Sequence, residues 1–204
     1  MIRARGLSRV FAGRDVIGSL DLDVDRGERV ALRGPNGSGK TTALRCIAGT
    51  LRPSTGDVTV GAHRAGSVAA RSLLGVSLAQ ERSFDLRLSG RANLLFFARL
   101  RLGSERAGRS AVDTLVDELE LAGIAAQRVA NSSTGMVQQL AFARALLGEP
   151  PAVLLDEPTR SLDEEARARL WDALDRRASL AVLLTTHSDE DAARCHQTIA
   201  LGGG

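Results

Sequence analysis

One short segment sets the architecture of this 204-residue chain: Gly34-Pro35-Asn36-Gly37-Ser38-Gly39-Lys40-Thr41. It matches the pattern G-x-x-x-x-G-K-[ST] at every position. Residues 29–33 before it read as a short buried strand, and residues 41–49 read as a helix closed by glycine. In this context the glycines let backbone N–H groups converge on a phosphate, and the helix start adds positive charge. The segment therefore predicts a nucleoside triphosphate site to which all of its residues contribute.

Three side chains at the end of this loop have the chemistry to act on phosphate and metal. Lys40 is the single lysine of the chain, and every other Lys/Arg position is arginine. A compact ammonium can reach the β- and γ-phosphates where a planar guanidinium does not substitute for it. We expect the Thr41 hydroxyl to ligate Mg²⁺ and Thr42 to add a further phosphate contact.

An acidic pair, Asp156-Glu157, ends a second apolar run at 152–155. In a parallel sheet the carboxyl end of such a strand lies beside the phosphate loop. Asp156 is expected to hold Mg²⁺ through water, because Mg²⁺ keeps part of its hydration shell. Glu157 is then placed to polarise the attacking water as a general base. Acidic pairs also occur at ordinary helix starts, and the phosphate loop favours the catalytic interpretation here.

Strand and helix patterns alternate along most of the chain, which predicts an α/β fold with a mostly parallel sheet. Between Gly90 and about Ile124, apolar residues recur at helical spacing, which predicts a helical insertion with a turn at 103–108. The other expected strands lie at 21–25, 57–61, 152–155 and 180–185, and the other expected helices at 136–147, 164–177 and 189–195.

Further motifs, taken in order with the phosphate loop and the acidic pair, resemble those of the ABC ATPases over nearly the whole chain. They are Phe11, Gln80 within 78–81, Ser133-Thr134-Gly135-Met136, Ser161-Leu162-Asp163 and His187. The four-residue run resembles the family signature LSGGQ, from which it departs at Ser132, Thr134 and Met136. It is the most diagnostic motif, because a phosphate loop alone leaves kinases, GTPases and helicases open.

The resemblance implies a role for each of these residues with ATP and Mg²⁺. Phe11 would stack on adenine, the alternative being an ordinary core aromatic. Gln80 would contact Mg²⁺ and take part in catalysis, and His187 would contact the γ-phosphate. The residues of a second anion cradle at a helix start would be Ser133, Gly135 and Met136, followed along the chain by Asp163.

The resemblance also implies a P-loop NTPase core with an antiparallel β subdomain at the N-terminus. An α-helical subdomain would be inserted at about 82–147, and residues 1–204 would form a single ABC ATPase domain. Because the insertion separates the second cradle from the phosphate loop, each ATP would be held by Lys40 of one copy and Ser133 of another. The expected assembly is a head-to-tail homodimer.

The motifs around 81–94 and 157–163 are similar to the branch of the family that exports polysaccharides, lipids, drugs or haem, and they leave the cargo open. We expect integral membrane permease subunits as partners, docked in a groove lined by part of an apolar cluster. The cluster comprises Phe84, Leu86, Leu88, Phe96 and Phe97. The alternative is a soluble ABC ATPase that acts on the ribosome or on DNA. Such proteins carry a second ATPase unit, a coiled coil or a zinc insertion, and this sequence has none of these patterns.

Charge and composition bear on location. The net charge is +3, and the arginines alternate with Asp and Glu, so we expect no nucleic-acid partner. No apolar run is long enough to cross a bilayer, the N-terminus does not read as a signal peptide, and we expect no appended domain after the last strand. Cys46 and Cys195 lack a metal or redox motif. We therefore expect a cytoplasmic protein, peripheral on the inner face of the cell membrane.

Overall fold

A five-stranded parallel sheet lies at the centre of the computed structural model, which describes residues 1–78 and 83–202. In spatial order its strands are β6 (Leu74–Ser77), β7 (Ala152–Asp156), β8 (Ala181–Thr185), β3 (Arg29–Arg33) and β9 (Gln197–Ala200). Because the sheet is parallel, the carboxyl ends of β3, β7 and β8 share one edge. The phosphate loop follows β3 and the acidic pair ends β7, so topology brings them to that edge.

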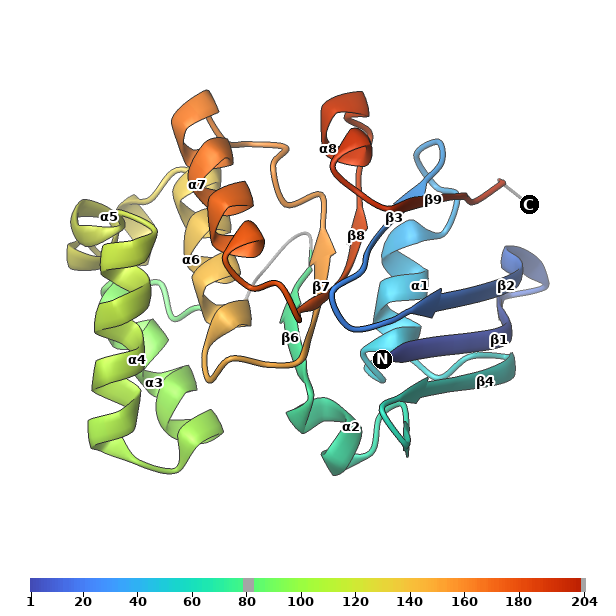
Figure 1. Ribbon diagram of the computed structural model, residues 1–204, viewed down its shortest axis with the longest axis horizontal. Coiled ribbons are helices and arrows are strands. Elements are labelled where there is room, and N and C mark those ends of the chain that lie inside the picture. Colours follow the sequence, from blue (N-terminus) through green and yellow to red (C-terminus); the bar gives the residue numbers. More distant parts are fainter. Residues whose placement is uncertain (79–82, 203–204) are drawn as a thin grey trace.

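The central strands are buried on both faces, which explains their nearly continuous apolar sequences. In β7, Val153 and Leu155 belong to one core cluster, whereas Ala152 and Leu154 belong to the other. Helices cover the sheet on both sides, α6 and α7 on one and α1 on the other (Figure 1). Their bounds are α1 (Lys40–Ile47), α6 (Thr134–Leu146) and α7 (Glu164–Asp175).

A second, antiparallel sheet packs on the far side of α1 (Figure 1). Its spatial order is β2-β1-β4-β5, with Ile2 of β1 opposite Val24 of β2 and Val60 of β4. The bounds are β1 (Ile2–Phe11), β2 (Arg14–Val24), β4 (Thr55–Val60) and β5 (His63–Arg64). The predicted fold class, a P-loop α/β core with an antiparallel N-terminal subdomain and inserted helices, is confirmed.

The helices at the opposite end of the molecule from the antiparallel sheet are α3 (Gly90–Leu102), α4 (Glu105–Glu118) and α5 (Ala122–Ala126). The turn between α3 and α4 is shorter than the predicted 103–108. Gly103, with φ +63°, ends α3, and the Ser104 hydroxyl accepts a hydrogen bond of 3.3 Å from the backbone N–H of Ala107. Since Ser104 caps α4, the helix begins at once.

Some elements have no counterpart in the sequence prediction. The alternation at 21–25 marks only the end of β2, and β1, β6 and β9 were not predicted. The structure also adds α2 (Val68–Ser72) and the 3₁₀ turn Val129–Asn131, whereas α8 (Asp189–Ala193) lies within the helix predicted at 189–195. β9 pairs with β3 and is the outermost strand of the sheet, next to the strand that leads into the phosphate loop.

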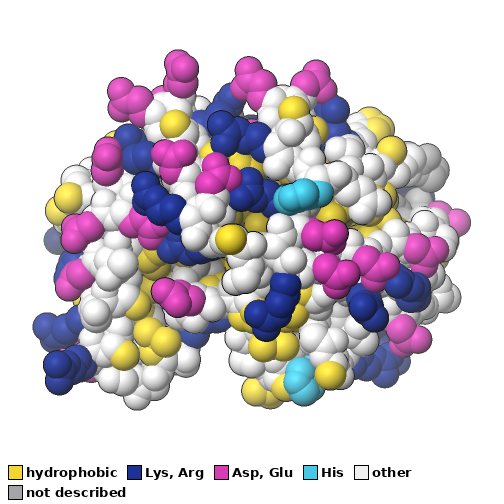
Figure 2. Space-filling view, in the orientation of Figure 1, with side chains coloured by type: hydrophobic (Ala, Val, Ile, Leu, Met, Phe, Trp, Pro, Cys, Tyr) yellow, Lys and Arg dark blue, Asp and Glu magenta, His cyan; other side chains and the backbone are white. Residues whose placement is uncertain are grey.

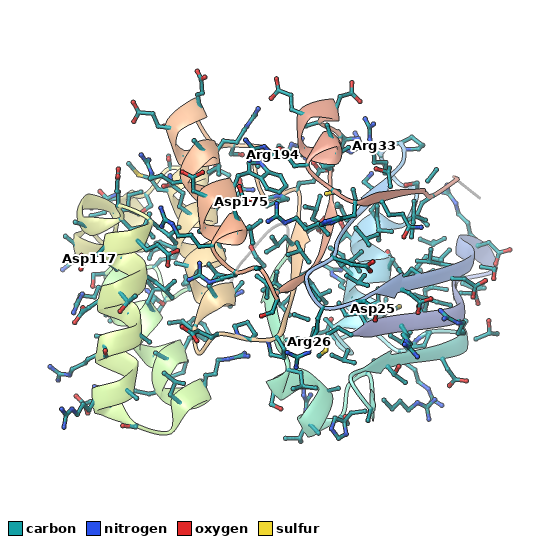
Figure 3. The ribbon with its side chains drawn as sticks, viewed as in Figure 1. Asp25, Arg26, Arg33, Asp117, Asp175 and Arg194 are labelled. Carbon is teal, nitrogen blue, oxygen red and sulfur yellow. The ribbon has the colours of Figure 1, made fainter. Side chains whose placement is uncertain are left out.

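Within residues 1–78 and 83–202, no helix combines the length and the apolar character that a membrane crossing requires. Basic and acidic side chains alternate over the face seen in Figure 2. Asp175, at the end of α7, pairs with Arg29 of β3 at 2.6 Å and with Arg194 at 3.8 Å (Figure 3). Both guanidinium groups also lie over the Trp171 ring, so this cluster ties α7 to the sheet.

Candidate active site

The phosphate loop is packed so closely that two of its glycines admit no side chain. A Cβ on Gly34 would lie 2.4 Å from the carbonyl oxygen of Leu201. A Cβ on Gly39, where φ is +91°, would lie 2.4 Å from the carbonyl oxygen of Val16 in β2. The loop is therefore held between the antiparallel sheet and the chain that follows β9.

Lys40 and Ser38 have the contacts expected of groups that receive an anion. Lys40 is 7% exposed, and its ammonium donates to the carbonyl oxygens of Gly34 at 2.7 Å and Pro35 at 3.1 Å, both within its own loop. The Ser38 hydroxyl is buried, and it has no hydrogen-bond partner among the described residues. A buried hydroxyl without a partner costs free energy, and a phosphate oxygen would satisfy it. The loop therefore fits the phosphates of a nucleotide.

Oxygen atoms from three elements converge beside the loop. The hydroxyl of Thr41, in α1, donates to Oδ2 of Asp156 at 2.8 Å, and the hydroxyl of Thr185, in β8, donates to Oδ1 at 2.6 Å. The described residues contain no cluster of three or more His, Cys, Asp or Glu side chains that would hold a metal by itself. Mg²⁺ is commonly held by one or two protein oxygens together with substrate phosphates and water, so this donor set fits it.

Glu157 stands in an unusual backbone conformation next to His187. Its φ is +49°, a left-handed value that a non-glycine residue rarely adopts. Its N–H is held by the carbonyl oxygen of Thr185 at 3.1 Å and by the Thr185 hydroxyl at 2.9 Å. Nε2 of His187 lies 3.2 Å from Oε1 of Glu157, but the two groups are not aligned as a hydrogen bond, and this buried oxygen has no such partner among the described residues. A buried carboxylate oxygen without a partner costs free energy, and a hydrogen bond from a water would satisfy it.

The predicted second cradle lies at the start of α6, where Ser133 caps the helix. Its hydroxyl accepts from the backbone N–H of Met136 at 3.3 Å. A Cβ on Gly135 would lie 2.3 Å from the carbonyl oxygen of Ser161, so the signature and the segment 161–163 are in close contact. Asp163 caps α7, since its carboxylate accepts from the N–H of Ala166 at 2.8 Å.

An open groove of about 600 Å³ joins the start of α6 to the acidic pair. Its lining includes Ser77 at the end of β6, Thr134 and Gln138 of α6, and both Asp156 and Glu157. The Gln138 amide donates to the Glu157 carbonyl oxygen. Residues 34–41, all of which the structure describes, do not line this groove.

Phe11 and Gln80 complete the predicted set. Phe11 ends β1, is 41% exposed, and pairs with Arg14 across the tip of the β1–β2 hairpin. Val16, two residues beyond Arg14, touches the phosphate loop at Gly39, so the hairpin tip lies near that loop. Thr42 lies in α1, half-buried. Gln80 falls outside the described residues.

Sequence reasoning missed residues that hold the acidic pair and the segments next to it. Thr185, which binds both Asp156 and the Glu157 backbone, is the one polar residue of β8. Asp191 is fully buried, and its carboxylate accepts from Thr159, from Thr186 at 3.2 Å and from the Trp171 indole at 3.2 Å. A polar residue at the end of an apolar strand was the available signal for Thr185, whereas nothing local marks Asp191.

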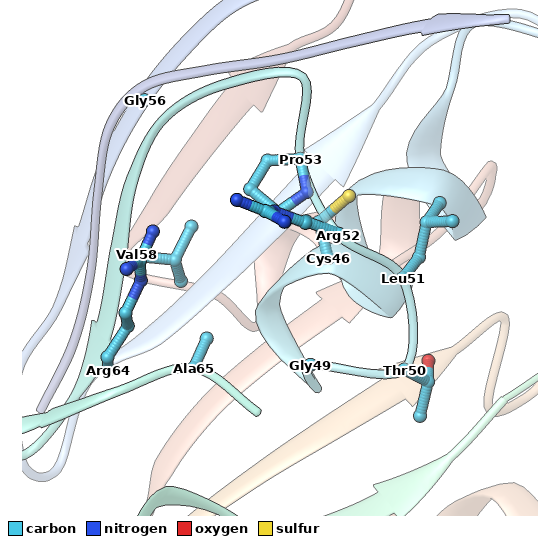
Figure 4. A pocket seen from close by; sticks show the side chains of 10 residues that line it. All are labelled: Cys46, Gly49, Thr50, Leu51, Arg52, Pro53, Gly56, Val58, Arg64 and Ala65. Atoms are coloured by element: carbon cyan, nitrogen blue, oxygen red, sulfur yellow. The ribbon is translucent and has the colours of Figure 1, made fainter. Parts of the chain in front are cut away.

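Two further cavities lie away from this site. One, of about 290 Å³, opens at the C-terminal end of α1 and is walled by Arg52, Arg64 and Cys46 (Figure 4). Since α1 begins at Lys40, this cavity lies at the other end of the helix from the phosphate loop. The described residues that line it include no carboxylate.

The other cavity is a groove of about 600 Å³ between α2, β6, the end of α3 and residues 147–151. Part of the five-residue apolar cluster was predicted to line a docking groove, and of these residues Phe97 lines this one. Phe96, 55% exposed, packs edge-on against Phe97 with ring centroids 5.3 Å apart. Phe84 lies beneath, 6% exposed, with its ring centroid 6.0 Å from that of Phe97. Leu86 and Leu88 are exposed but do not line the groove.

Comparison with known proteins finds relatives over most of the chain. Residues 17–160 match the family model described as ABC transporter. The chain is 39% identical over 206 residues to Nod factor export ATP-binding protein I of Rhizobium johnstonii, a match covering 98% of this chain and 65% of that protein. It is 37% identical over 196 residues to daunorubicin resistance ATP-binding protein DrrA3 of Streptomyces coeruleorubidus, covering 94% and 61%. The chain thus spans a little under two thirds of the length of these relatives.

Solved structures show the same architecture. The ATP-binding subunit of an ABC transporter superposes with a TM-score of 0.88 at 28% identity, covering 98% of this chain and 85% of that one. A bacterial ABC transporter cassette solved as a dimer superposes with a TM-score of 0.89 at 24% identity, covering 99% and 94%. The second likeness bears on the fold alone.

Proposed function

The chain belongs to the ABC transporter family, and we propose on that basis that it is the ATP-binding and ATP-hydrolysing subunit of an exporter. The observation that carries the proposal is the meeting of Thr41, Asp156 and Glu157 at one sheet edge. The first two supply oxygens for Mg²⁺, and the third supplies a carboxylate next to them. Residues 1–204 would act as one ABC ATPase domain, with a helical subdomain at about 82–147.

Each residue of the site has a task in hydrolysis. Lys40 leaves the carbonyl oxygens of its own loop and binds the β- and γ-phosphates, while the loop N–H groups and the Ser38 hydroxyl complete the cradle. Glu157 takes a proton from the attacking water. His187, 44% exposed and 3.2 Å from that carboxylate, contacts the γ-phosphate. Gln80 would contribute a ligand to Mg²⁺.

The second cradle acts on the nucleotide of another copy. In support of this, the groove at the start of α6 has no lining residue from 34–41, so the signature and the phosphate loop do not share that groove. A head-to-tail homodimer supplies each site with its missing half. ATP bridges the two copies through its γ-phosphate, so binding closes the dimer and hydrolysis reopens it.

The partners in transport would be separate permease subunits, which would hold the chain on the cytoplasmic face of the cell membrane. Two relatives support export: one is an export ATP-binding protein and the other a drug resistance ATP-binding protein. The groove between α2, β6 and α3, with Phe97 in its wall and Phe96 exposed beside it, is the docking surface we propose. No nucleic acid takes part in this scheme.

The test of the proposed function is the substitution Glu157→Gln, with Glu164→Gln as a matched control in the exposed first turn of α7. Loss of a general base lowers turnover by about 10²- to 10⁴-fold. We expect Glu157→Gln to bind ATP and to elute as a dimer in its presence, whereas Lys40→Ala binds no ATP. ATP hydrolysis at the original rate by Glu157→Gln would remove the proposed base, and a monomer at saturating ATP would remove the proposed dimer.

A further inference from the structure

The Phe11 ring is stacked against a cation from its own strand. Cζ of Arg9 lies 4.2 Å from the ring centroid, which is the geometry of a cation–π contact. Arg9 and Phe11 are two residues apart near the end of β1, where the register with β2 shifts, and their contact places both side chains on one side of the strand. The ring is still 41% exposed, which leaves surface for a second flat group.

Arg9 is fixed to the segment that follows α1. Its Nη1 donates to the carbonyl oxygen of Arg52 at 3.0 Å, and Arg52 is one wall of the cavity in Figure 4. The same strand end is held through Ser54, whose hydroxyl accepts from the N–H of Val10 at 3.0 Å and whose N–H donates to the carbonyl oxygen of Ser8 at 2.8 Å. The hairpin tip is thus tied to the C-terminal end of the helix that starts at Lys40.

A second contact ties the tip to the other end of that helix. The backbone of Val16, on the returning strand, is so close to Gly39 that a Cβ there would lie 2.4 Å from the Val16 carbonyl oxygen. The backbone of the hairpin tip is therefore placed relative to the phosphate loop, and the Arg9 guanidinium lies in contact with the Phe11 ring.

We propose that Arg9 is a positioning residue for the nucleotide base: it holds one face of the Phe11 ring so that the other face receives adenine. The inference rests on the proposed function, within which Phe11 is the base platform. In the resulting stack, the phenyl ring of Phe11 lies between the Arg9 guanidinium and the adenine. Because the guanidinium restrains the ring before the nucleotide arrives, less conformational entropy is lost on binding.

The proposal predicts that replacing Arg9 affects the binding of ligands that contain a base and not the binding of ligands that lack one. A bare tripolyphosphate meets Lys40 and the loop N–H groups but no stacking platform. Replacing Arg9 should therefore weaken binding of ATP and leave binding of inorganic tripolyphosphate unchanged. A loss of general positive charge would weaken both ligands, since both are highly charged phosphate chains.

The experiment measures dissociation constants for ATP and for inorganic tripolyphosphate by calorimetry, with EDTA present to prevent hydrolysis. The variants are Arg9→Gln, which removes the charge but keeps a donor for the Arg52 carbonyl, Arg9→Lys, which keeps a cation, and Phe11→Ala. Arg3→Gln is the matched control, because Arg3 lies on the same strand and pairs with Asp23 instead. Thermal melts establish that each variant is folded.

We expect Arg9→Gln to weaken ATP binding about two- to fivefold, Phe11→Ala to weaken it about tenfold or more, and Arg9→Lys to recover part of the loss. In the Phe11→Ala background, Arg9→Gln should have no further effect. Unchanged ATP affinity in Arg9→Gln overturns the inference, as does an equal loss for tripolyphosphate or an additive effect with Phe11→Ala. In each of these cases ATP binding by the parent chain leaves the proposed function intact, whereas a parent chain that binds neither ligand removes the proposed function as well.

Discussion

The Thr41 hydroxyl donates a hydrogen bond of 2.8 Å to the Asp156 carboxylate, across 115 residues of sequence. Thr41 lies in the first turn of α1 and Asp156 ends β7, so the contact joins the phosphate loop to the acidic pair. With Thr185 on the other carboxylate oxygen at 2.6 Å, Asp156 is fixed from both sides. The two proposed metal ligands are therefore pre-positioned next to each other.

Removing the Thr41 hydroxyl should affect magnesium more than nucleotide. Thr41→Val keeps the shape of the side chain and deletes one proposed ligand. We expect the Mg²⁺ concentration for half-maximal ATP hydrolysis to rise about 10- to 100-fold, while ATP affinity in EDTA stays the same. Thr50→Val, in the exposed segment just after α1, is the control. An unchanged magnesium requirement would contradict the assignment of Thr41.

A charge at the exposed Phe96, beside the proposed docking groove, should detach the chain from the proposed permease subunits. Phe96 is 55% exposed, so Phe96→Asp alters the surface with little cost to the core, whereas Phe84→Asp would bury a charge. We expect purified Phe96→Asp to hydrolyse ATP at the original rate but to sediment less with membranes of its host. Ser179→Asp, exposed and outside this groove, is the control. Equal sedimentation of both variants would place the docking surface elsewhere.

An ion pair joins the end of α4 to Arg177, just after α7. Its removal should lower the free energy of unfolding. The carboxylate oxygens of Glu118, at the end of α4, each lie 2.7 Å from Arg177, and Glu118 is 13% exposed. Hydrogen bonding from the Arg177 side chain holds the pKa of Glu118 below its usual 4.5. Glu118→Gln should lower the free energy of unfolding by about 1–3 kcal/mol at pH 7, measured in urea.

The pH dependence of that difference has a definite sign. Because the folded-state pKa of Glu118 is lowered, its contribution is present above the unfolded value of 4.5 and is lost as the pH falls through the folded value. The parent chain and Glu118→Gln should therefore converge in stability below pH 4.5. Glu165→Gln, at an 88% exposed position, should behave as the parent throughout. A gap between the parent and Glu118→Gln that persists in acid would mean that packing, not charge, is responsible.

Cys195 should resist alkylation in the folded chain. Burial raises the pKa of its thiol from 9.0 to about 11. At pH 8 the reactive thiolate is then about 100-fold scarcer than in the unfolded chain, and the rate with iodoacetamide should keep rising with pH up to about 11. Mass spectrometry of the separate peptides distinguishes Cys195 from Cys46. Equal rates for folded and urea-unfolded protein at pH 8 would show that the thiol is not shielded.

Local chemistry made most of the candidate site predictable. The phosphate loop, the acidic pair and the signature are contiguous runs, because each has to offer several groups to one phosphate or metal at once. The buried strands β3, β7 and β8 were also readable, since burial on both faces requires an almost unbroken apolar run. β9 was not predicted, because it is an edge strand with mostly exposed residues and therefore lacks a continuous apolar run.

The sequence by itself therefore determined that the chain has a phosphate loop, an acidic pair at the end of a buried strand and a P-loop α/β core, because these depend on residue types at short spacing. Only the tertiary structure decided which side chains meet across long separations: Thr41 with Asp156, Glu157 with His187, and Arg177 with Glu118. It also placed the Arg9 guanidinium over the Phe11 ring and in a hydrogen bond to the Arg52 carbonyl oxygen. Such contacts arise where strands and helices distant in sequence share one sheet edge or one surface, and their order in space is set by packing of the whole core.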